Sequence, residues 1–177
     1  MIVNVEIRQI AALIESKERT WTLRNGDIEI FKALTERQLM GLCIEREAAS
    51  EPQEGRIAVG TVILNRVDKK GWMGKTIQDV ILKPWQFSWT MPEAGEAYYE
   101  QAVKFASDFH DALLGYEDLE DCFTLACDMI DGVISRDPDL EGCVQYLNPK
   151  TAAKTKEKWE AAGMKIIKQI SHHDFFL

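Results

Sequence analysis

Apolar residues recur at helical spacing in much of this chain. Leu39, Met40, Cys43 and Ile44 form one apolar stripe, and a capping-box pattern, Thr35-Glu36-Arg37-Gln38, precedes it. The pattern predicts a helix from residue 35 to about residue 50. Pro52 suits the first turn of a second helix, and Thr76 is placed to begin a short third helix that Pro84 ends.

The second half of the chain predicts more helices and a little sheet. Residues 93–114 and 118–135 read as two long helices on either side of Gly115, and a last helix is expected at 151–162. Residues 143–147 are β-like and end at the turn signal Asn148-Pro149, and residues 164–177 are also strand-like.

The first 34 residues predict a separate small accessory segment. Residues 4–18 fit a short amphipathic helix, and residues 20–31 alternate around Asn25-Gly26, which is a strong hairpin signal. We therefore expect an accessory segment at 1–34 and one main domain at 35–177. The expected fold class is mainly α (α+β), with a small β element.

Composition excludes several classes of function. The chain has 177 residues, a net charge of −8 and no long basic stripe, which argues against nucleic acid as a partner. No apolar run approaches the roughly 20 residues that span a bilayer, so no membrane insertion is expected. The amino terminus lacks the features of a secretory signal, which predicts synthesis in a cytoplasm without one. We expect a monomer.

The four cysteines form no Cys-x-x-Cys pair and sit among apolar residues, as reduced core cysteines do. The adjacent pair His172-His173 does not have the spacing of helical metal ligands, and no glycine-rich phosphate loop is present. We expect neither a metal nor a cofactor.

Glu47 is the strongest candidate for catalysis. It follows Cys43 by four residues and lies within the apolar stripe, whereas Glu45 is expected to point to solvent. An apolar environment raises the pKa of a carboxyl group, which a general acid needs at neutral pH. The alternative is a buried structural glutamate that pairs with Arg46, Arg66 or a backbone donor.

A loop with three aromatic residues follows Pro84. Trp85, Phe87 and Trp89 alternate with Gln86 and Ser88. Aromatic rings can stack on sugar rings while the polar residues bond to hydroxyl or acetamido groups, which makes this loop a candidate binding edge. The alternative is that all three rings fill the core.

Two blocks of sequence carry a resemblance to a known family. The first is Glu47-Ala48-Ala49-Ser50-Glu51-Pro52-Gln53-Glu54-Gly55 with residues 58–67, which end in Leu64-Asn65-Arg66-Val67. The second comprises residues 76–81 and Gln86-Phe87-Ser88-Trp89. A weaker third block runs from Asp137-Pro138 to the end of the chain, where Gln145 and Leu147 depart from the pattern. Together they resemble the SleB/CwlJ-type cell wall hydrolases of spore cortex-lytic enzymes and phages.

The resemblance implies a lysozyme-like domain, similar to lytic transglycosylases, that acts on bacterial peptidoglycan. Its catalytic glutamate falls on Glu47. The candidate substrate-binding residues are Gln86, Phe87, Ser88, Tyr146 and Asn148. The expected reaction cleaves the β-1,4 bond between N-acetylmuramic acid and N-acetylglucosamine and leaves 1,6-anhydro ends.

Two other functions stay open at the level of sequence. One is a hydrolytic muramidase that uses Glu47 and a second carboxylate that the sequence does not place. The other is a glycan-binding or virion structural module without catalysis. A chain without a secretory signal suits a phage lysis or virion protein better than a secreted spore enzyme.

Overall fold

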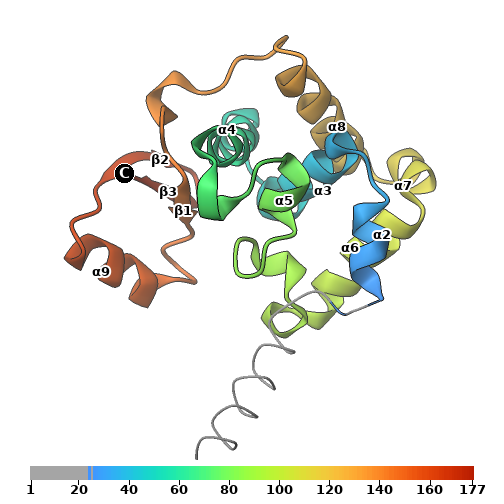
Figure 1. The fold of residues 1–177 in the computed structure, drawn as a ribbon, viewed down its shortest axis with the longest axis horizontal. Coiled ribbons are helices and arrows are strands. Elements are labelled where there is room, and N and C mark those ends of the chain that lie inside the picture. The colour runs from blue at the N-terminus through green and yellow to red at the C-terminus, as the bar shows by residue number, and fades with distance from the viewer. Residues whose placement is uncertain (1–23, 25) are drawn as a thin grey trace, which may run out of the picture.

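The computed structural model describes Arg24 and residues 26–177, which form a helical body and a smaller sheet lobe (Figure 1). The helical body contains α2 (Asp27–Lys32), α3 (Glu36–Ala48), α4 (Gln53–Lys69), α5 (Ile77–Ile81), α6 (Glu96–Ser107), α7 (Phe109–Gly115) and α8 (Glu117–Ile130). The sheet lobe contains β1 (Gln145–Leu147), α9 (Ala153–Ala161), β2 (Ile166–Ile170) and β3 (His173–Phe176). Short 3₁₀ turns are η1 (Gly71–Met73), η2 (Ser88–Thr90), η3 (Pro92–Ala94) and η4 (Pro138–Leu140).

Helix α3 lies at the centre of the helical body. It begins at Thr35, whose side chain accepts from the backbone N–H of Gln38 while the Gln38 side chain accepts from the backbone N–H of Thr35. This confirms the predicted capping box. Every residue from Leu39 to Arg46 is buried, because α8, α4, α5 and α6 pack around the helix. A helix that is covered on all sides needs more than the single apolar stripe that the sequence predicted.

Helix α4 separates the helical body from the sheet lobe. Val59 and Ile63 belong to the core around α3, whereas Ala58 and Val62 pack in a second core with Phe175. The sheet has the order β1-β3-β2, and both strand pairs are antiparallel. In this register Tyr146 lies opposite Phe175.

The predicted hairpin at 20–31 is wrong over its second half, where the chain forms α2. Asp27 and Glu29 lie in the first turn of this helix and Lys32 in its last turn, an arrangement that suits the helix dipole. Phe31 is fully buried and Leu34 nearly so, both in the same core as α3. The predicted helix at 4–18 and the first hairpin strand, at 20–23, lie outside the described residues. The boundary at residue 35 stays a prediction.

Other predicted elements are confirmed with shifted ends. The expected long helix at 93–114 breaks at Asp108, whose non-helical backbone ends α6 and whose side chain caps α7 at Asp111. The expected helix at 118–135 ends at Ile130, and the strand-like carboxyl end is two strands joined by a turn. All four cysteines are free thiols. In the described part of the chain, no helix combines the length and apolar character needed to cross a membrane.

Two glycines lie where α3 and α4 pack closely against α8. A Cβ on Gly41 would lie 2.7 Å from the backbone Cα of Phe123 on α8, and a Cβ on Gly60 would lie 2.6 Å from the side-chain sulfur of Met129. We expect Gly41→Ala to lower the free energy of unfolding by roughly 1–3 kcal/mol, because backbone has to move. Gly60→Ala should cost less, since a flexible methionine side chain can rotate away. Urea denaturation checks this, and equal losses would contradict it.

Candidate active site

Glu47 lies in the last turn of α3, where the helical body meets the sheet lobe. The residue is half-buried, and its Oε2 accepts a hydrogen bond from the hydroxyl of Tyr146 at 2.9 Å. Tyr146 comes from β1 and is 99 positions away in the chain. The contact therefore joins two parts of the protein that only the fold brings together.

The environment of Glu47 favours its protonated form. Burial raises the pKa of Glu47 from its ordinary 4.5 to about 7. The Tyr146 hydrogen bond and the positive charge of Arg66 act to lower that pKa, but burial outweighs both. Such a carboxyl group holds its proton near neutral pH and can release it to a leaving oxygen.

Arg66 acts on Glu47 through its charge and not through an ion pair. Its Nε donates to the carbonyl oxygen of Val144 at 2.9 Å, and its guanidinium lies 5.0 Å from the centre of the Phe87 ring. Within residues 24 and 26–177, the ion pairs of 4.0 Å or less do not include Glu47. Glu47 therefore does not form an ion pair with Arg66, which was one form of the alternative in which Glu47 has a structural role.

The sequence-based expectation for Glu45 is wrong. Glu45 is only 6% exposed, and both of its carboxylate oxygens accept from Arg46, the next residue. Arg46 also donates to Gln101 on α6 and lies over the ring of Tyr98. Because α6 covers this face of α3, the side that was expected to face solvent is buried. The pairing also removes Arg46 as a partner for Glu47.

A buried cluster around Glu51 is a feature that the sequence analysis missed. The Glu51 side chain is 2% exposed, and its Oε1 lies 2.8 Å from Nδ1 of His172 and 3.8 Å from Nδ1 of His173. Burial by itself raises the pKa of Glu51, but hydrogen bonds from Ser171 and His172 outweigh it and lower the pKa. The ring of His173 packs edge-on against Tyr146, with centroids 5.2 Å apart.

The cluster thus contacts the ring of Tyr146, whose hydroxyl binds Glu47. Its members were visible in the sequence as Glu51-Pro52 and His172-His173, but only as separate motifs. Glu51 and His172 are 121 positions apart, so nothing local connects them. Among the described residues, the structure gathers no group of three or more His, Cys, Asp or Glu side chains that could hold a metal ion.

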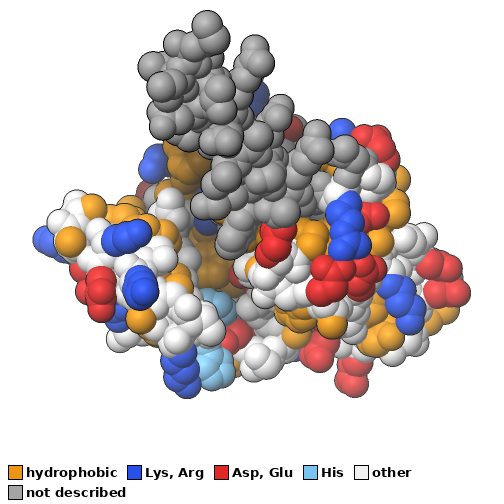
Figure 2. Space-filling view, turned by 90° about the horizontal axis from the view of Figure 1, so that it is seen from below, with side chains coloured by type: hydrophobic (Ala, Val, Ile, Leu, Met, Phe, Trp, Pro, Cys, Tyr) orange, Lys and Arg blue, Asp and Glu red, His pale blue; other side chains and the backbone are white. Residues whose placement is uncertain are grey.

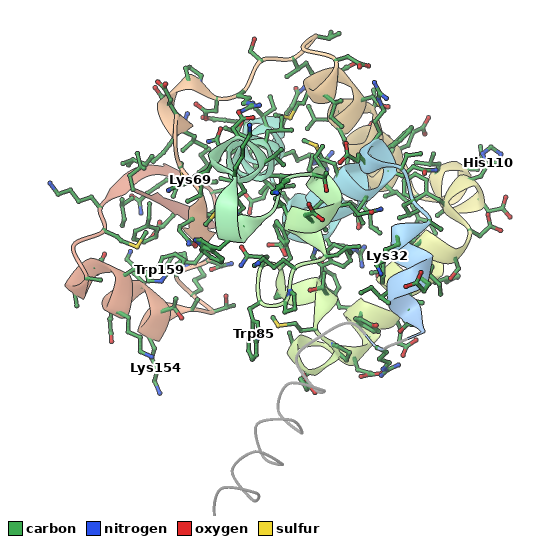
Figure 3. All side chains as sticks on the ribbon, viewed as in Figure 1. Lys32, Lys69, Trp85, His110, Lys154 and Trp159 are labelled. Atoms are coloured by element: carbon green, nitrogen blue, oxygen red, sulfur yellow. The ribbon has the colours of Figure 1, made fainter. Side chains whose placement is uncertain are left out.

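The aromatic loop divides between core and surface. Phe87 and Trp89 are buried, at 2% and 1% exposure, whereas Trp85 is 56% exposed. Figure 3 shows Trp85 pointing outward from the loop after α5, on the same edge of the molecule as α9. Gln86 is half-buried and Ser88 is exposed. Phe87 therefore supports Arg66 from the core, and a substrate at the surface would meet its polar neighbours instead.

Asn148 ends the segment that begins with Tyr146. Its side-chain oxygen accepts from the backbone N–H of Lys150 at 2.9 Å, and its carbonyl oxygen accepts from Ala152. These bonds form the turn that leads into α9. Asn148 is half-buried, as Tyr146 is.

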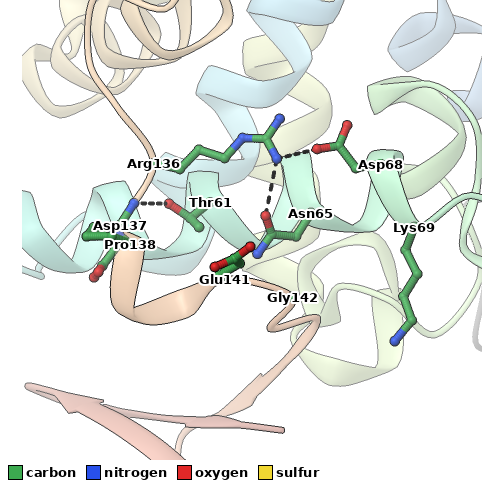
Figure 4. Close-up of a pocket in the computed structure, with 9 residues that line it drawn as sticks. All are labelled: Thr61, Asn65, Asp68, Lys69, Arg136, Asp137, Pro138, Glu141 and Gly142. Atoms are coloured by element: carbon green, nitrogen blue, oxygen red, sulfur yellow. Dashed lines mark hydrogen bonds and ion pairs between the residues drawn. The ribbon is translucent and has the colours of Figure 1, made fainter.

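The molecular surface is hollowed between the helical body and the sheet lobe. Figure 2 shows this hollow with apolar and histidine side chains in its wall. A second hollow, shown in Figure 4, is lined by residues of α4 and of the segment around η4. There Arg136 binds Asp68 and Asn65, and Asn65 donates to the carbonyl oxygens of Leu140 and Cys143. This second hollow is a structural junction, and Glu47 is not among its residues.

Comparisons with known proteins agree with this fold. A solved structure, the catalytic domain of the germination-specific lytic transglycosylase SleB from Bacillus anthracis, is similar with a TM-score of 0.53 and 24% identity. The match covers 82% of this chain and 98% of that domain, and it supports the predicted mainly helical, lysozyme-like fold. The comparison with curated proteins gives no match.

A family model described as Cell Wall Hydrolase matches residues 50–176. The matched segment contains Glu51, Arg66, Tyr146 and both histidines of the cluster, and it begins just after Glu47. Since it covers well over half of the sequence, the chain belongs to the cell wall hydrolase family.

Proposed function

We propose that the chain cleaves the glycan strands of peptidoglycan as a lytic transglycosylase, with Glu47 as its general acid. The bond cleaved is the β-1,4 link between N-acetylmuramic acid and N-acetylglucosamine. Membership of the cell wall hydrolase family supports the substrate. The observation that carries the mechanism is a carboxyl group with a pKa of about 7, bonded to Tyr146 where the two lobes meet.

In the first step Glu47 donates its proton to the oxygen that links the two sugars. The bond from C1 of the muramic acid to that oxygen breaks, and N-acetylglucosamine leaves with a free hydroxyl group. Positive charge then develops at C1 of the muramic acid. The Tyr146 hydroxyl, which donates to Oε2, stabilises the carboxylate that Glu47 becomes.

In the second step the Glu47 carboxylate removes the proton from the C6 hydroxyl of the same muramic acid. The C6 oxygen attacks C1, which closes a 1,6-anhydro ring and returns the proton to Glu47. Attack within one sugar ring profits from proximity and consumes no water. The glutamate is therefore ready for another cycle.

The neighbouring carboxylates favour this single-acid mechanism over hydrolysis by a carboxylate pair. Paired glycosidases place two carboxyl groups about 5–9.5 Å apart on either side of the bond. Glu45 is paired with Arg46, and Glu51 is buried in contact with His172. Neither carboxylate is free to activate a water molecule beside the sugar.

The substrate would lie in the hollow between the helical body and the sheet lobe. We assign Gln86, Ser88, Tyr146 and Asn148 to its walls, since none of these is fully buried. Phe87 contributes from below by supporting the guanidinium of Arg66. Trp85, exposed at the end of the same loop, offers a flat apolar face to a sugar ring.

Replacement of Glu47 by Gln tests the proposed acid. Glu47→Gln keeps the shape of the side chain and cannot donate a proton, so we expect release of muropeptides to fall by about 100- to 10,000-fold. Glu54→Gln, on the exposed start of α4, is the matched control and should retain activity. Mass spectrometry of the released fragments identifies the reaction. Anhydro ends support the transglycosylase, reducing ends indicate hydrolysis, and binding without release indicates a glycan-binding module.

The pH dependence of cleavage tests the role of Tyr146. Since Glu47 must be protonated and its pKa is about 7, wild-type activity should fall as the pH rises through 7. Tyr146→Phe removes the donor that stabilises the carboxylate, which raises this pKa further and moves the descending limb to higher pH. Tyr116→Phe, on the exposed start of α8, should leave the limb in place. A limb unaffected by Tyr146→Phe would show that another group sets it.

The raised pKa of Glu47 also predicts a cost in stability. An acid whose pKa is higher in the folded protein has no effect on stability below its unfolded pKa. The cost grows as the pH rises above that value, and it is complete above the folded pKa. A shift from 4.5 to about 7 corresponds to roughly 3 kcal/mol. We expect Glu47→Gln to be more stable than the wild type at pH 8, with the difference lost near pH 4. Thermal denaturation at both pH values measures it, and a constant difference would contradict it.

A further inference from the structure

A basic hollow with an exposed tryptophan lies on the helical body, apart from Glu47. It has a volume of about 480 Å³, and its wall includes Trp72, Lys32, Lys75 and Lys83. Trp72 is 62% exposed, more than Trp85 at 56%. A large aromatic side chain left on the surface beside lysines is a common feature of binding sites.

The backbone holds Trp72 in this exposed position. Lys70 has a φ of 54°, an uncommon value for a residue other than glycine, and Gly71 and Gly74 also have positive φ. A Cβ on Gly74 would lie 2.8 Å from the Cβ of Asp79, so the segment is pressed against α5. The neighbouring Met73 is buried. The segment is therefore anchored directly after Trp72, and an uncommon backbone conformation such as that of Lys70 often accompanies function.

The charge of the hollow is opposite to that of the whole chain. The net charge is −8, yet the wall of the hollow has Lys32, Lys75 and Lys83 against one acidic residue, Asp79. Lys32 is paired with Glu29 at 3.1 Å, so Lys75 and Lys83 supply the positive charge of the hollow. The Asp79 carboxylate accepts from the backbone N–H of Lys75 at 3.1 Å and helps to shape the hollow. The ammonium group of Lys83 lies 5.6 Å from the centre of the Trp72 ring. Charge and ring together suit a ligand with sugar rings and negative groups.

The hollow adjoins the loop that we assign to the substrate groove. Lys83 and Leu82 belong to its wall, and Trp85 and Gln86 follow them directly in the chain. A polymer that passes Gln86 and Trp85 can reach Lys83 and Trp72 without leaving the surface.

We propose that the basic hollow is a second binding surface for peptidoglycan, which holds the carboxylates of its stem peptides through lysines and a sugar ring through Trp72. The proposal rests on the proposed function, because it takes the substrate from there. It also explains how a protein with a charge of −8 stays on an acidic polymer. Long-range repulsion is screened beyond about 8–10 Å, whereas the lysines act at contact.

Binding to purified peptidoglycan tests the surface separately from cleavage. Sacculi freed of phosphate-containing wall polymers are mixed with Glu47→Gln protein, so that digestion does not interfere, and the bound fraction is measured by sedimentation. Adding Trp72→Ala, or Lys75→Glu with Lys83→Glu, should weaken binding roughly ten-fold or more. The matched control is Lys154→Glu with Lys158→Glu on α9, which makes the same change in charge and should bind as before. Circular dichroism confirms that each variant is folded.

The source of the negative charge is tested on the substrate. Removal of the stem peptides by an amidase should weaken binding of the Glu47→Gln protein as much as the lysine replacements do, and the effect of both should shrink at high salt. Equal binding by all variants would overturn the proposal, as would binding that depends on restored wall phosphates and not on stem peptides. Release of muropeptides by the wild-type protein is measured on the same sacculi. If release occurs while the hollow variants bind normally, the proposed function stands and this inference fails.

Discussion

The burial of α3 from Leu39 to Arg46 is the constraint from which the rest of the structure follows. α8, α4, α5 and α6 cover the helix, so its polar side chains near the carboxyl end must find partners within the protein. Glu45 finds Arg46, the next residue, and the backbone carbonyl of Arg46 accepts from Tyr98. Glu47 lies two positions after Glu45, and its carboxylate accepts a hydrogen bond from the Tyr146 hydroxyl of the sheet lobe. The candidate catalytic carboxyl group thus lies at the carboxyl end of α3, where the neighbouring helices no longer cover the helix completely.

The pKa of Glu47 is set by effects that oppose one another. Burial favours the neutral acid, while the Tyr146 hydroxyl and the charge of Arg66 favour the carboxylate. A residue that acts first as a general acid and then as a base needs both its protonated form and its carboxylate to be populated near the working pH. His173 of the Glu51 cluster packs edge-on against the ring of Tyr146, which donates to Glu47. Arg66 is fixed in turn by Val144 and Phe87.

In the proposed mode of binding, shape and charge recognise the substrate at two different places on the surface. The hollow between the lobes would hold the glycan, whereas the basic hollow carries lysines and Trp72 on a chain that is acidic overall. Among the described residues, the two exposed tryptophans, Trp72 and Trp85, lie at backbone of uncommon conformation. Trp85 itself has a φ of 71°, and Trp72 follows Lys70 and Gly71, which have positive φ.

The sequence by itself determined the features that depend on near neighbours. The caps at Thr35 and Thr76 and the turn at Asn148-Pro149 are formed by residues within a few positions of one another, so local patterns predicted them. Helical spacing placed Glu47 in an apolar environment, and the motif around it indicated the family. The same local reasoning failed at residues 27–31, where the chain forms α2 and Phe31 is buried in the core around α3.

Only the tertiary structure decided which side chains meet. Glu45 is buried because α6 covers it, and Phe87 and Trp89 enter the core while Trp85 stays at the surface. The contacts of Tyr146 with Glu47 and of His172 with Glu51 join positions 99 and 121 residues apart. Periodicity specifies which face of one element is apolar, but not which element covers that face. Burial, and with it the pKa of a carboxyl group, is therefore a property of the assembled fold.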